Sequence, residues 1–118
     1  MSSGRAQGST PYLNAAVADT PVLVKAGKIA LASFNIYNPS NANAYVRFYD
    51  AAVATDVTAG TTVPDYVVGG VTLGFIHSGF SRPIQFTKGM VIAAATTAAD
   101  SGHVAPNVAL VVALGLST

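Results

Sequence analysis

Hydrophobic and polar residues alternate along most of this chain with a period of two, which is the period of a β-strand with one buried face. The alternation is clearest in AYVRFYD at residues 44–50. Further runs rich in Val, Ile, Phe and Thr are separated by turn residues, and the full set occupies residues 22–24, 29–38, 44–50, 66–68, 71–76, 83–86, 90–97 and 108–116. This spacing predicts an all-β fold, an antiparallel β-sandwich of the jelly-roll type.

Two connections between these runs suggest how the strands are arranged. The turn cluster NPSNAN at residues 38–43 is typical of a tight connection, so residues 29–38 and 44–50 are expected to form an antiparallel hairpin. The longer connection at residues 51–65 favours a crossing between two sheets. The strand faces predict a core that comprises Phe34, Ile36, Val46, Phe48, Phe86, Ile92 and Val111.

Helix is the alternative for two segments, the Ala-rich residues 93–95 and the apolar residues 108–116. Their neighbours are Val, Ile and Thr, and the chain has no Glu that could form i,i+4 pairs with Lys or Arg. Both segments are also short for a helix, so we prefer strands at these positions.

The first twenty residues differ from the rest of the chain. Residues 1–10 are rich in Ser and Gly, and residues 1–20 lack the continuous apolar stretch of a secretion signal. We therefore expect an extended N-terminal arm at residues 1–20 and a β-sandwich domain at residues 21–118. Pro11 favours an extended path, and Tyr12 and Leu13 are the expected anchors of the arm on a neighbouring subunit.

The low charge of the chain excludes some partners and favours others. Only 9% of its 118 residues are charged, six Lys or Arg and five Asp, whereas an average domain has about 25%. So few cations cannot form a phosphate-binding face, and we expect no nucleic-acid partner. The longest apolar run is about half of a membrane-spanning helix, so no membrane partner is expected. A weakly charged surface favours association, and we expect a homo-oligomer, specifically a trimer.

Two segments resemble functional motifs but lack the spacing or the residues that those motifs require. The segment GGVTLG at residues 69–74 lacks the spacing of a phosphate-binding loop and is typical of a β-turn or bulge. The segment GFSR at residues 79–82 is followed by Pro83, where a nucleophile elbow requires Gly. The chain has no Cys, which excludes a disulfide, a thiolate metal site and a Cys nucleophile.

The His and Asp residues also give no catalytic or metal-binding pattern. His77 and His103 lie in expected loops, and no other ligands stand at the spacing that a metal site needs. Asp50, Asp56 and Asp65 could converge on a cation, but their spacing matches no known loop, which favours solvated turn carboxylates. We therefore expect no enzyme activity, no catalytic residue, no metal and no cofactor.

Three long side chains share one face of the strand predicted at residues 44–50. They are Tyr45, Arg47 and Tyr49, and Tyr and Arg are favoured at protein interfaces. The stripe is therefore a candidate interface. A solvent-exposed face in which Arg47 lies between two aromatic rings is an equal alternative, and a small-molecule site is a weaker one.

The order of strands and turns resembles a known group of proteins. The resemblance rests on LASFNIYN at residues 31–38, AYVRFYDA at 44–51, GTTVPD at 60–65 and PIQFTKGMVIA at 83–93. These segments are similar to small β-sandwich structural proteins of tailed bacteriophages, in particular capsid decoration (cement) proteins. The resemblance implies a non-enzymatic virion protein on the capsid surface, which binds the major capsid protein and copies of itself and stabilises the shell. It transfers no functional residue.

Two other functions remain open from the sequence. A tail or fibre adaptor of the virion would have a similar pattern of strands and turns. A small carbohydrate-binding β-sandwich module would instead use the face of Tyr45, Arg47 and Tyr49.

Overall fold

The computed structural model describes residues 10–97, 104–106 and 108–117. These residues form eight β-strands and one short 3₁₀ helix, and they contain no α-helix. The strands are β1 (Thr10–Val17), β2 (Val22–Ala26), β3 (Ile29–Asn38), β4 (Ala44–Asp50), β5 (Tyr66–Val71), β6 (Gly74–Phe86), β7 (Gly89–Ala95) and β8 (Leu110–Ser117), and the 3₁₀ helix is η1 (Ala54–Asp56). The all-β prediction is confirmed, and β7 and β8 occupy the two segments for which helix was the alternative.

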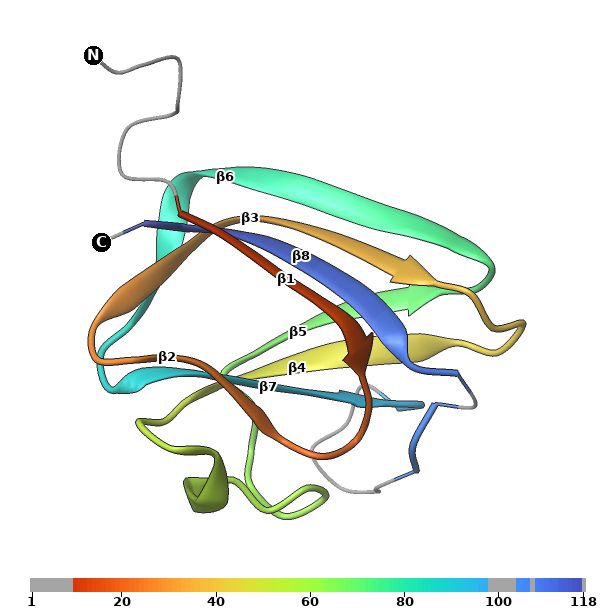
Figure 1. The fold of residues 1–118 in the computed structure, drawn as a ribbon, viewed down its shortest axis with the longest axis horizontal. Helices are drawn as coiled ribbons and strands as arrows, with labels where there is room; N and C mark the ends of the chain where they lie inside the picture. Colours follow the sequence, from red (N-terminus) through yellow and green to blue (C-terminus); the bar gives the residue numbers. More distant parts are fainter. Residues whose placement is uncertain (1–9, 98–103, 107, 118) are drawn as a thin grey trace.

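The strands form two antiparallel sheets of four strands each. One sheet has the order β1-β8-β3-β6 and the other the order β2-β7-β4-β5. In Figure 1 the first sheet is the upper layer and the second the lower layer. This two-layer arrangement is compatible with a β-sandwich.

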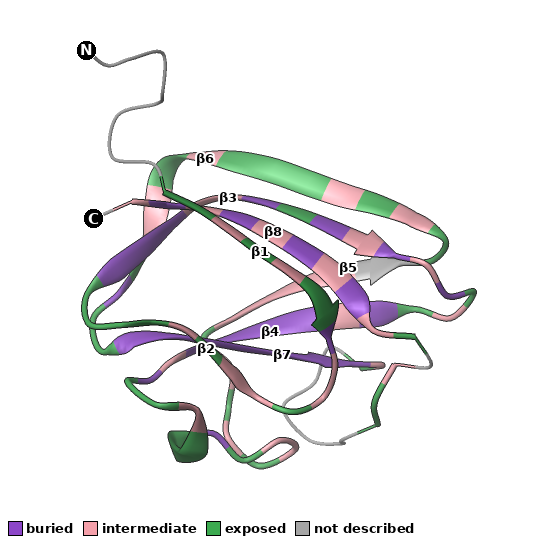
Figure 2. Ribbon diagram, in the orientation of Figure 1, coloured by how far each residue is buried: buried purple, intermediate pink, exposed green. Residues whose placement is uncertain are grey.

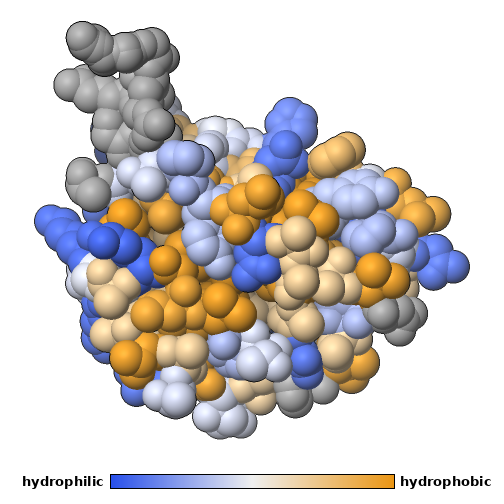
Figure 3. Space-filling view, viewed as in Figure 1, coloured by the Kyte–Doolittle hydropathy of each residue, from blue (hydrophilic) through white to orange (hydrophobic). Residues whose placement is uncertain are grey.

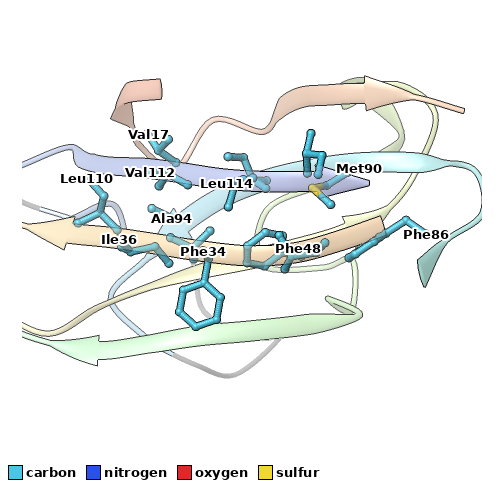
Figure 4. Close-up of a cluster of buried hydrophobic side chains, with 14 of the residues drawn as sticks. Val17, Phe34, Ile36, Phe48, Phe86, Met90, Ala94, Leu110, Val112 and Leu114 are labelled. Atoms are coloured by element: carbon cyan, nitrogen blue, oxygen red, sulfur yellow. The ribbon is translucent and has the colours of Figure 1, made fainter. Parts of the chain in front are cut away.

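The main hydrophobic core lies between the two sheets and receives side chains from both. Phe48 on β4 and Val112 on β8 are completely buried, with an exposed fraction of 0%. β7, in the middle of its sheet, is buried along its whole length (Figure 2). The core members labelled in Figure 4 are Val17, Phe34, Ile36, Phe48, Phe86, Met90, Ala94, Leu110, Val112 and Leu114.

Six of the seven core residues predicted from the sequence are buried, and the prediction for Val111 is wrong. The buried face of β8 carries Leu110, Val112, Leu114 and Leu116, while Val111 lies on the other face and is half-buried. Residues 108–116 are apolar on both faces, so alternation alone does not determine which face is inside, and a one-residue slip exchanges the two faces.

A β-bulge changes the inward face partway along β3. The register shifts between Leu31 and Ser33 against both neighbouring strands. Before the bulge Ile29 and Leu31 face the core, and after it Phe34 and Ile36 do. An extra residue at a bulge shifts the alternation by one position, which explains why this strand appears apolar on both faces in the sequence.

The predicted hairpin between residues 29–38 and 44–50 is wrong. β3 belongs to one sheet and β4 to the other, so the connection at residues 39–43 crosses between the layers. Asn38, which is buried, holds this corner: its Nδ2 donates to the carbonyl oxygen of Ala42 at 2.8 Å, and its Oδ1 accepts from the Ser40 N–H at 3.0 Å. The turn residues at positions 38–43 therefore predicted a short connection correctly. They did not predict which strand pairs with β3.

The prediction for the longer connection at residues 51–65 is also wrong. It joins β4 to β5, which are neighbours in the same sheet. The extra length is used to cover the outer face of that sheet, because Ala51 and Val57 pack there in a second apolar cluster with Tyr49, Val91 and Ala93. The length of this connection is therefore explained by the sheet face that it covers, because it does not cross between the two sheets.

Part of the predicted N-terminal arm belongs to a sheet. Residues 10–17 form β1, which pairs antiparallel with β8 from Thr10 opposite Leu116 to Val17 opposite Leu110. Val17 is completely buried in the core. The predicted boundary between residues 20 and 21 is therefore wrong for this strand, and residues 1–9 of the predicted arm lie outside the described residues.

β5 and β6 are longer than the sequence predicted. Gly69 lies at a register shift of β5 against β4, which confirms that the glycine-rich segment contains a β-bulge. The runs predicted at residues 71–76 and 83–86 are largely parts of β6, an edge strand of 13 residues. Pro83 is compatible with this strand because it lies at a register shift on the edge of the sheet.

Candidate functional site

The predicted stripe of Tyr45, Arg47 and Tyr49 is not an exposed surface. Arg47 and Tyr49 each have an exposed fraction of 1%, and Tyr45 is half-buried. The Arg47 Nη2 donates to the carbonyl oxygen and to the Oγ1 of Thr97, both at 2.9 Å. The prediction of an interface at Arg47 and Tyr49, and the alternative of a solvent-exposed face, are therefore both wrong for these two residues.

The burial of this stripe follows from what covers its sheet. The connection at residues 51–65 packs Ala51 and Val57 against Tyr49. The Tyr49 hydroxyl is buried and has no hydrogen-bond partner among the described residues. Strand periodicity places side chains on a face, but it does not reveal that a loop distant in sequence covers that face.

Asp50 makes several hydrogen bonds to the backbone of a neighbouring turn. Its carboxylate accepts hydrogen bonds from the backbone N–H groups of Thr87 (3.1 Å), Lys88 (2.8 Å) and Gly89 (3.3 Å), and from the Thr87 hydroxyl (3.0 Å). Its own N–H donates to Asp65 Oδ2 at 2.7 Å. Asp50 thereby ties the end of β4 to the turn between β6 and β7.

These hydrogen bonds also affect the ionisation of Asp50. Partial burial raises the pKa of its carboxyl group, but the hydrogen bonds from Lys88, Thr87 and Gly89 favour the carboxylate and outweigh burial. The net result is a pKa below the ordinary value of 3.8. Asp50 therefore acts as an anion that organises a turn.

Asp50, Asp56 and Asp65 line one polar hollow of about 360 Å³ at this end of the molecule, together with Thr62 and Lys88. The sequence favoured solvated turn carboxylates over a cation site at these positions. The oxygens of Asp50 and Asp65 accept hydrogen bonds from the backbone. In the described ranges, no group of three or more His, Cys, Asp or Glu side chains is arranged to hold a metal ion.

The two His residues are not brought together with these carboxylates. His77 is exposed on β6, opposite Asn35 of β3, while His103 lies outside the described residues. His77 therefore belongs to the other sheet.

The outer face of the β1-β8-β3-β6 sheet, which we call the A face, can be traced from the register of its strands. Residues directly opposite in an antiparallel sheet lie on the same face, so the register arranges the A face in three rows. The rows are Phe75-Tyr37-Val111, His77-Asn35-Ala113-Leu13 and Gly79-Ser33-Gly115-Pro11. None of these residues is Lys, Arg, Asp or Glu.

The A face has a shallow hollow whose wall includes an exposed apolar side chain. Leu13 is 70% exposed. It is one of the residues that line a mainly apolar hollow of about 340 Å³, together with Ser33, Ala113 and Gly115. At one end of the face the rings of Tyr37 and Phe75 pack at a centroid distance of 4.9 Å, and Phe75 is 64% exposed.

The structure separates the two anchors predicted in the N-terminal segment. Tyr12 is half-buried and packs against the main core, so part of its ring is already used within the chain, and its anchoring role on a neighbour stays a prediction. Leu13 points to the other face and is exposed, as an interface residue must be. Figure 3 shows apolar residues gathered over the side of the molecule where β1 and β2 lie.

The A face was missed in the sequence because its residues come from four separate strands. Ser33, Ala113 and Gly115 are unremarkable in isolation, and only the register brings them together. The available signal was the absence of Lys, Arg, Asp and Glu from residues 29–38 and 108–117.

Comparisons with family models, with curated proteins and with solved structures find no match to this chain. In the described part of the chain, no helix is long and apolar enough to span a membrane.

Proposed function

We propose that this chain is a non-enzymatic structural protein of a tailed-bacteriophage virion. It is a jelly roll that decorates the capsid surface, binds the major capsid protein and copies of itself, and stabilises the shell. The segments at residues 31–38, 44–51 and 83–93 that resemble cement proteins lie mainly on β3, β4, β6 and β7, which include three of the four central strands of the two sheets.

The pairing of the strands is the observation that carries this proposal. β1 pairs with β8, β2 with β7, β3 with β6 and β4 with β5. Each strand of the first half thus pairs with its counterpart counted from the other end, and this nested pairing supports the jelly-roll part of the proposal. Eight-stranded jelly rolls recur in viral capsid domains and in lectins.

The distribution of charge supports the structural role. Contacts that resist salt depend on buried apolar area and not on screened surface charge, and the A face has no charged residue among the positions defined above. Arg47 and Asp50 use their polar atoms to hold the chain's own backbone. This use of charged groups is the pattern of a scaffold rather than of a catalytic site.

Because lectins share the architecture, fold alone does not separate a virion protein from a carbohydrate-binding module. The module considered from the sequence needs Arg47 and Tyr49 on an open face, and both are buried. A tail or fibre adaptor is the nearer alternative, because it would have the same fold and a similar surface.

Quantitative mass spectrometry of purified particles tests the proposal. A decoration protein is present in a number comparable to that of the major capsid protein, whereas an adaptor is present in a few copies per particle. The matched control is a particle produced without this chain, which should release its genome at a lower temperature. Absence of the chain from intact particles would overturn the proposal, and a few copies per particle would favour the adaptor.

A further inference from the structure

We infer that the connection at residues 51–65, which we call the strap, opens as a unit while the two sheets stay folded, and thereby uncovers the outer face of β4 and β7. This motion belongs to the chain alone and is independent of the proposed function. Three features of the described residues favour it: the positions of the strap's hydrogen bonds, its small buried surface, and the polar groups beneath it.

The strap is hydrogen-bonded to the strands at its two ends. At one end the Ala51 N–H donates to the Gly89 carbonyl oxygen on β7 at 3.2 Å, and at the other the Asp65 N–H donates to the Phe48 carbonyl oxygen on β4 at 2.8 Å. Among the described residues, the backbone hydrogen bonds of the intervening segment 53–62 join strap residues to one another. The middle of the strap can therefore leave the sheet without breaking a backbone hydrogen bond to a strand.

One buried side chain holds the middle of the strap against the sheet. Ala51 and Val57 are the buried residues of the strap, all of which is described, and Ala51 lies at its end (Figure 2). Val57 packs in the second apolar cluster with Tyr49 and Val91, whereas Val63 is 64% exposed. Burial of a single Val is a small gain compared with that of a strand whose side chains fill the main core. The strap should therefore open far more often than the strands unfold.

The polar groups beneath the strap favour opening. The Tyr49 hydroxyl is buried without a hydrogen-bond partner among the described residues, which is unfavourable, and water can bind it once the strap has moved away. The strap and the rest of the chain also share the polar hollow of about 360 Å³, which is lined by Asp56 and Thr62 from the strap and by Tyr49 and Lys88 from outside it. Close packing between the strap and the sheet is interrupted at this hollow.

Opening changes the surface of the molecule but not its strand pairing. In the closed state Tyr49, Val91 and Ala93 have exposed fractions of 1%, 0% and 3%. The pairing of β4 with β5 and β7 uses no residue of the strap, so both sheets persist when it opens. The open state is therefore a minor folded conformation with apolar surface that the closed state conceals.

Labelling of introduced thiols under native conditions tests the inference. The chain has no Cys, so a single introduced thiol is the only one that reacts with an aromatic disulfide reagent. Val91→Cys places the thiol in the cluster beneath the strap, and Ala94→Cys, the matched control on the same strand, places it in the main core between the sheets. The thiol of Val91→Cys should react at least about 100-fold faster. Low concentrations of urea should scarcely change its rate and should steeply raise that of Ala94→Cys, because only global unfolding exposes a large surface.

A second pair of variants identifies the strap as the part that moves. In the Val91→Cys background, Val57→Ala should accelerate labelling about tenfold, because the open state no longer has to give up the buried Val side chain. Val63→Ala is the matched control on the same strap. Its side chain is 64% exposed, and its replacement should leave the labelling rate unchanged.

Two results overturn the inference. One is an equal rate with equal urea dependence for Val91→Cys and Ala94→Cys, because the strap would then open only with the whole fold. The other is a Val57→Ala variant that is labelled no faster than Val63→Ala. Should Val91→Cys or Ala94→Cys fail to melt cooperatively, Ala93→Cys and Ile92→Cys repeat the comparison on the same two faces of β7. Purified chain is used throughout, so the outcome is separate from that of the proposed function.

Discussion

At the scale of single residues, a few polar side chains organise backbone that the strands leave unpaired. Asp50 accepts hydrogen bonds from three consecutive N–H groups of the turn at residues 87–89. Arg47 reaches the backbone of Thr97, fifty positions away in the chain. Both side chains connect segments distant in sequence, so their replacement should affect the stability of the fold.

Replacement of Asp50 by Asn should destabilise the protein at neutral pH by about 1 kcal/mol, a value reduced for solvent exposure. The carboxylate is favoured in the folded state, which lowers its pKa below 3.8. Its stabilisation is therefore present above the unfolded-state pKa and is lost as the pH falls through the lower folded-state pKa. Urea unfolding at pH 7 and at pH 3 measures this: the gap between wild type and Asp50→Asn should narrow at the lower pH. A constant gap contradicts the role of the carboxylate.

Replacement of Tyr49 by Phe should leave stability unchanged or raise it by up to about 1 kcal/mol, because it removes a buried hydroxyl that has no partner. The ring, which packs with Val57 and Val91, is retained. Urea denaturation provides the measurement. A loss of more than about 1 kcal/mol would mean that the hydroxyl has a partner in solution.

At the scale of elements, two local features of the backbone shape the strands. A bulge changes which face of a strand is inside, and a close contact between two backbone segments restricts which residue can stand there. The bulge in β3 moves the core face from Leu31 to Phe34. Gly89 begins β7 with a φ of +153°, and a Cβ there would lie 2.5 Å from the Ala51 carbonyl oxygen and 2.7 Å from that of Lys25. Such positions accept only glycine, because the neighbouring atoms are backbone and cannot turn aside.

The substitution Gly89→Ala should therefore destabilise the protein by more than about 3 kcal/mol, since it combines positive φ with a backbone clash. Gly27 provides the matched control, with a φ of +87° and no atom within 4 Å of an added Cβ. Gly27→Ala should cost only about 1–2 kcal/mol, for the backbone conformation alone. Thermal and urea melts compare the two variants, and equal losses would show that the close approach at Gly89 has no effect.

A pair of truncations tests the assignment of β1 to the sandwich. Removal of residues 1–20 deletes β1, which leaves one edge of β8 without a paired strand and removes Val17 from the core. The shortened protein should therefore lose cooperative unfolding. Removal of residues 1–9 leaves every described strand in place and should preserve it. Circular dichroism melts report the result. A cooperative fold in the shorter chain would mean that β1 is dispensable, as the sequence-based domain boundary implied.

At the scale of the whole molecule, the sequence predicted the class of fold but not the pairing of strands. Alternation identified β3, β4 and six core residues because one face of each strand must be apolar. It could not predict that β3 and β4 lie in different sheets, since a turn sequence carries no information about layers.

The same limit applies to the candidate functional sites, because the sequence does not reveal contacts between distant segments. Arg47 and Tyr49 were placed on the correct strand but not beneath the connection that buries them. Leu13 was predicted to anchor the N-terminal arm on a neighbour, and its side chain is exposed. The residues that surround Leu13 on the A face depend on a register that the sequence does not reveal. Local chemistry was therefore predictable, whereas properties that depend on contacts between distant segments were not.

The central claim, that this chain is a structural protein of a virion, is tested most directly by electron cryo-microscopy of the intact particle. The account predicts density for the two four-stranded sheets, repeated with the symmetry of the shell on its outer surface. Density for this fold at the tail alone would move the protein to the adaptor role. A particle reconstructed at side-chain detail with no density for this fold at any position would contradict the account.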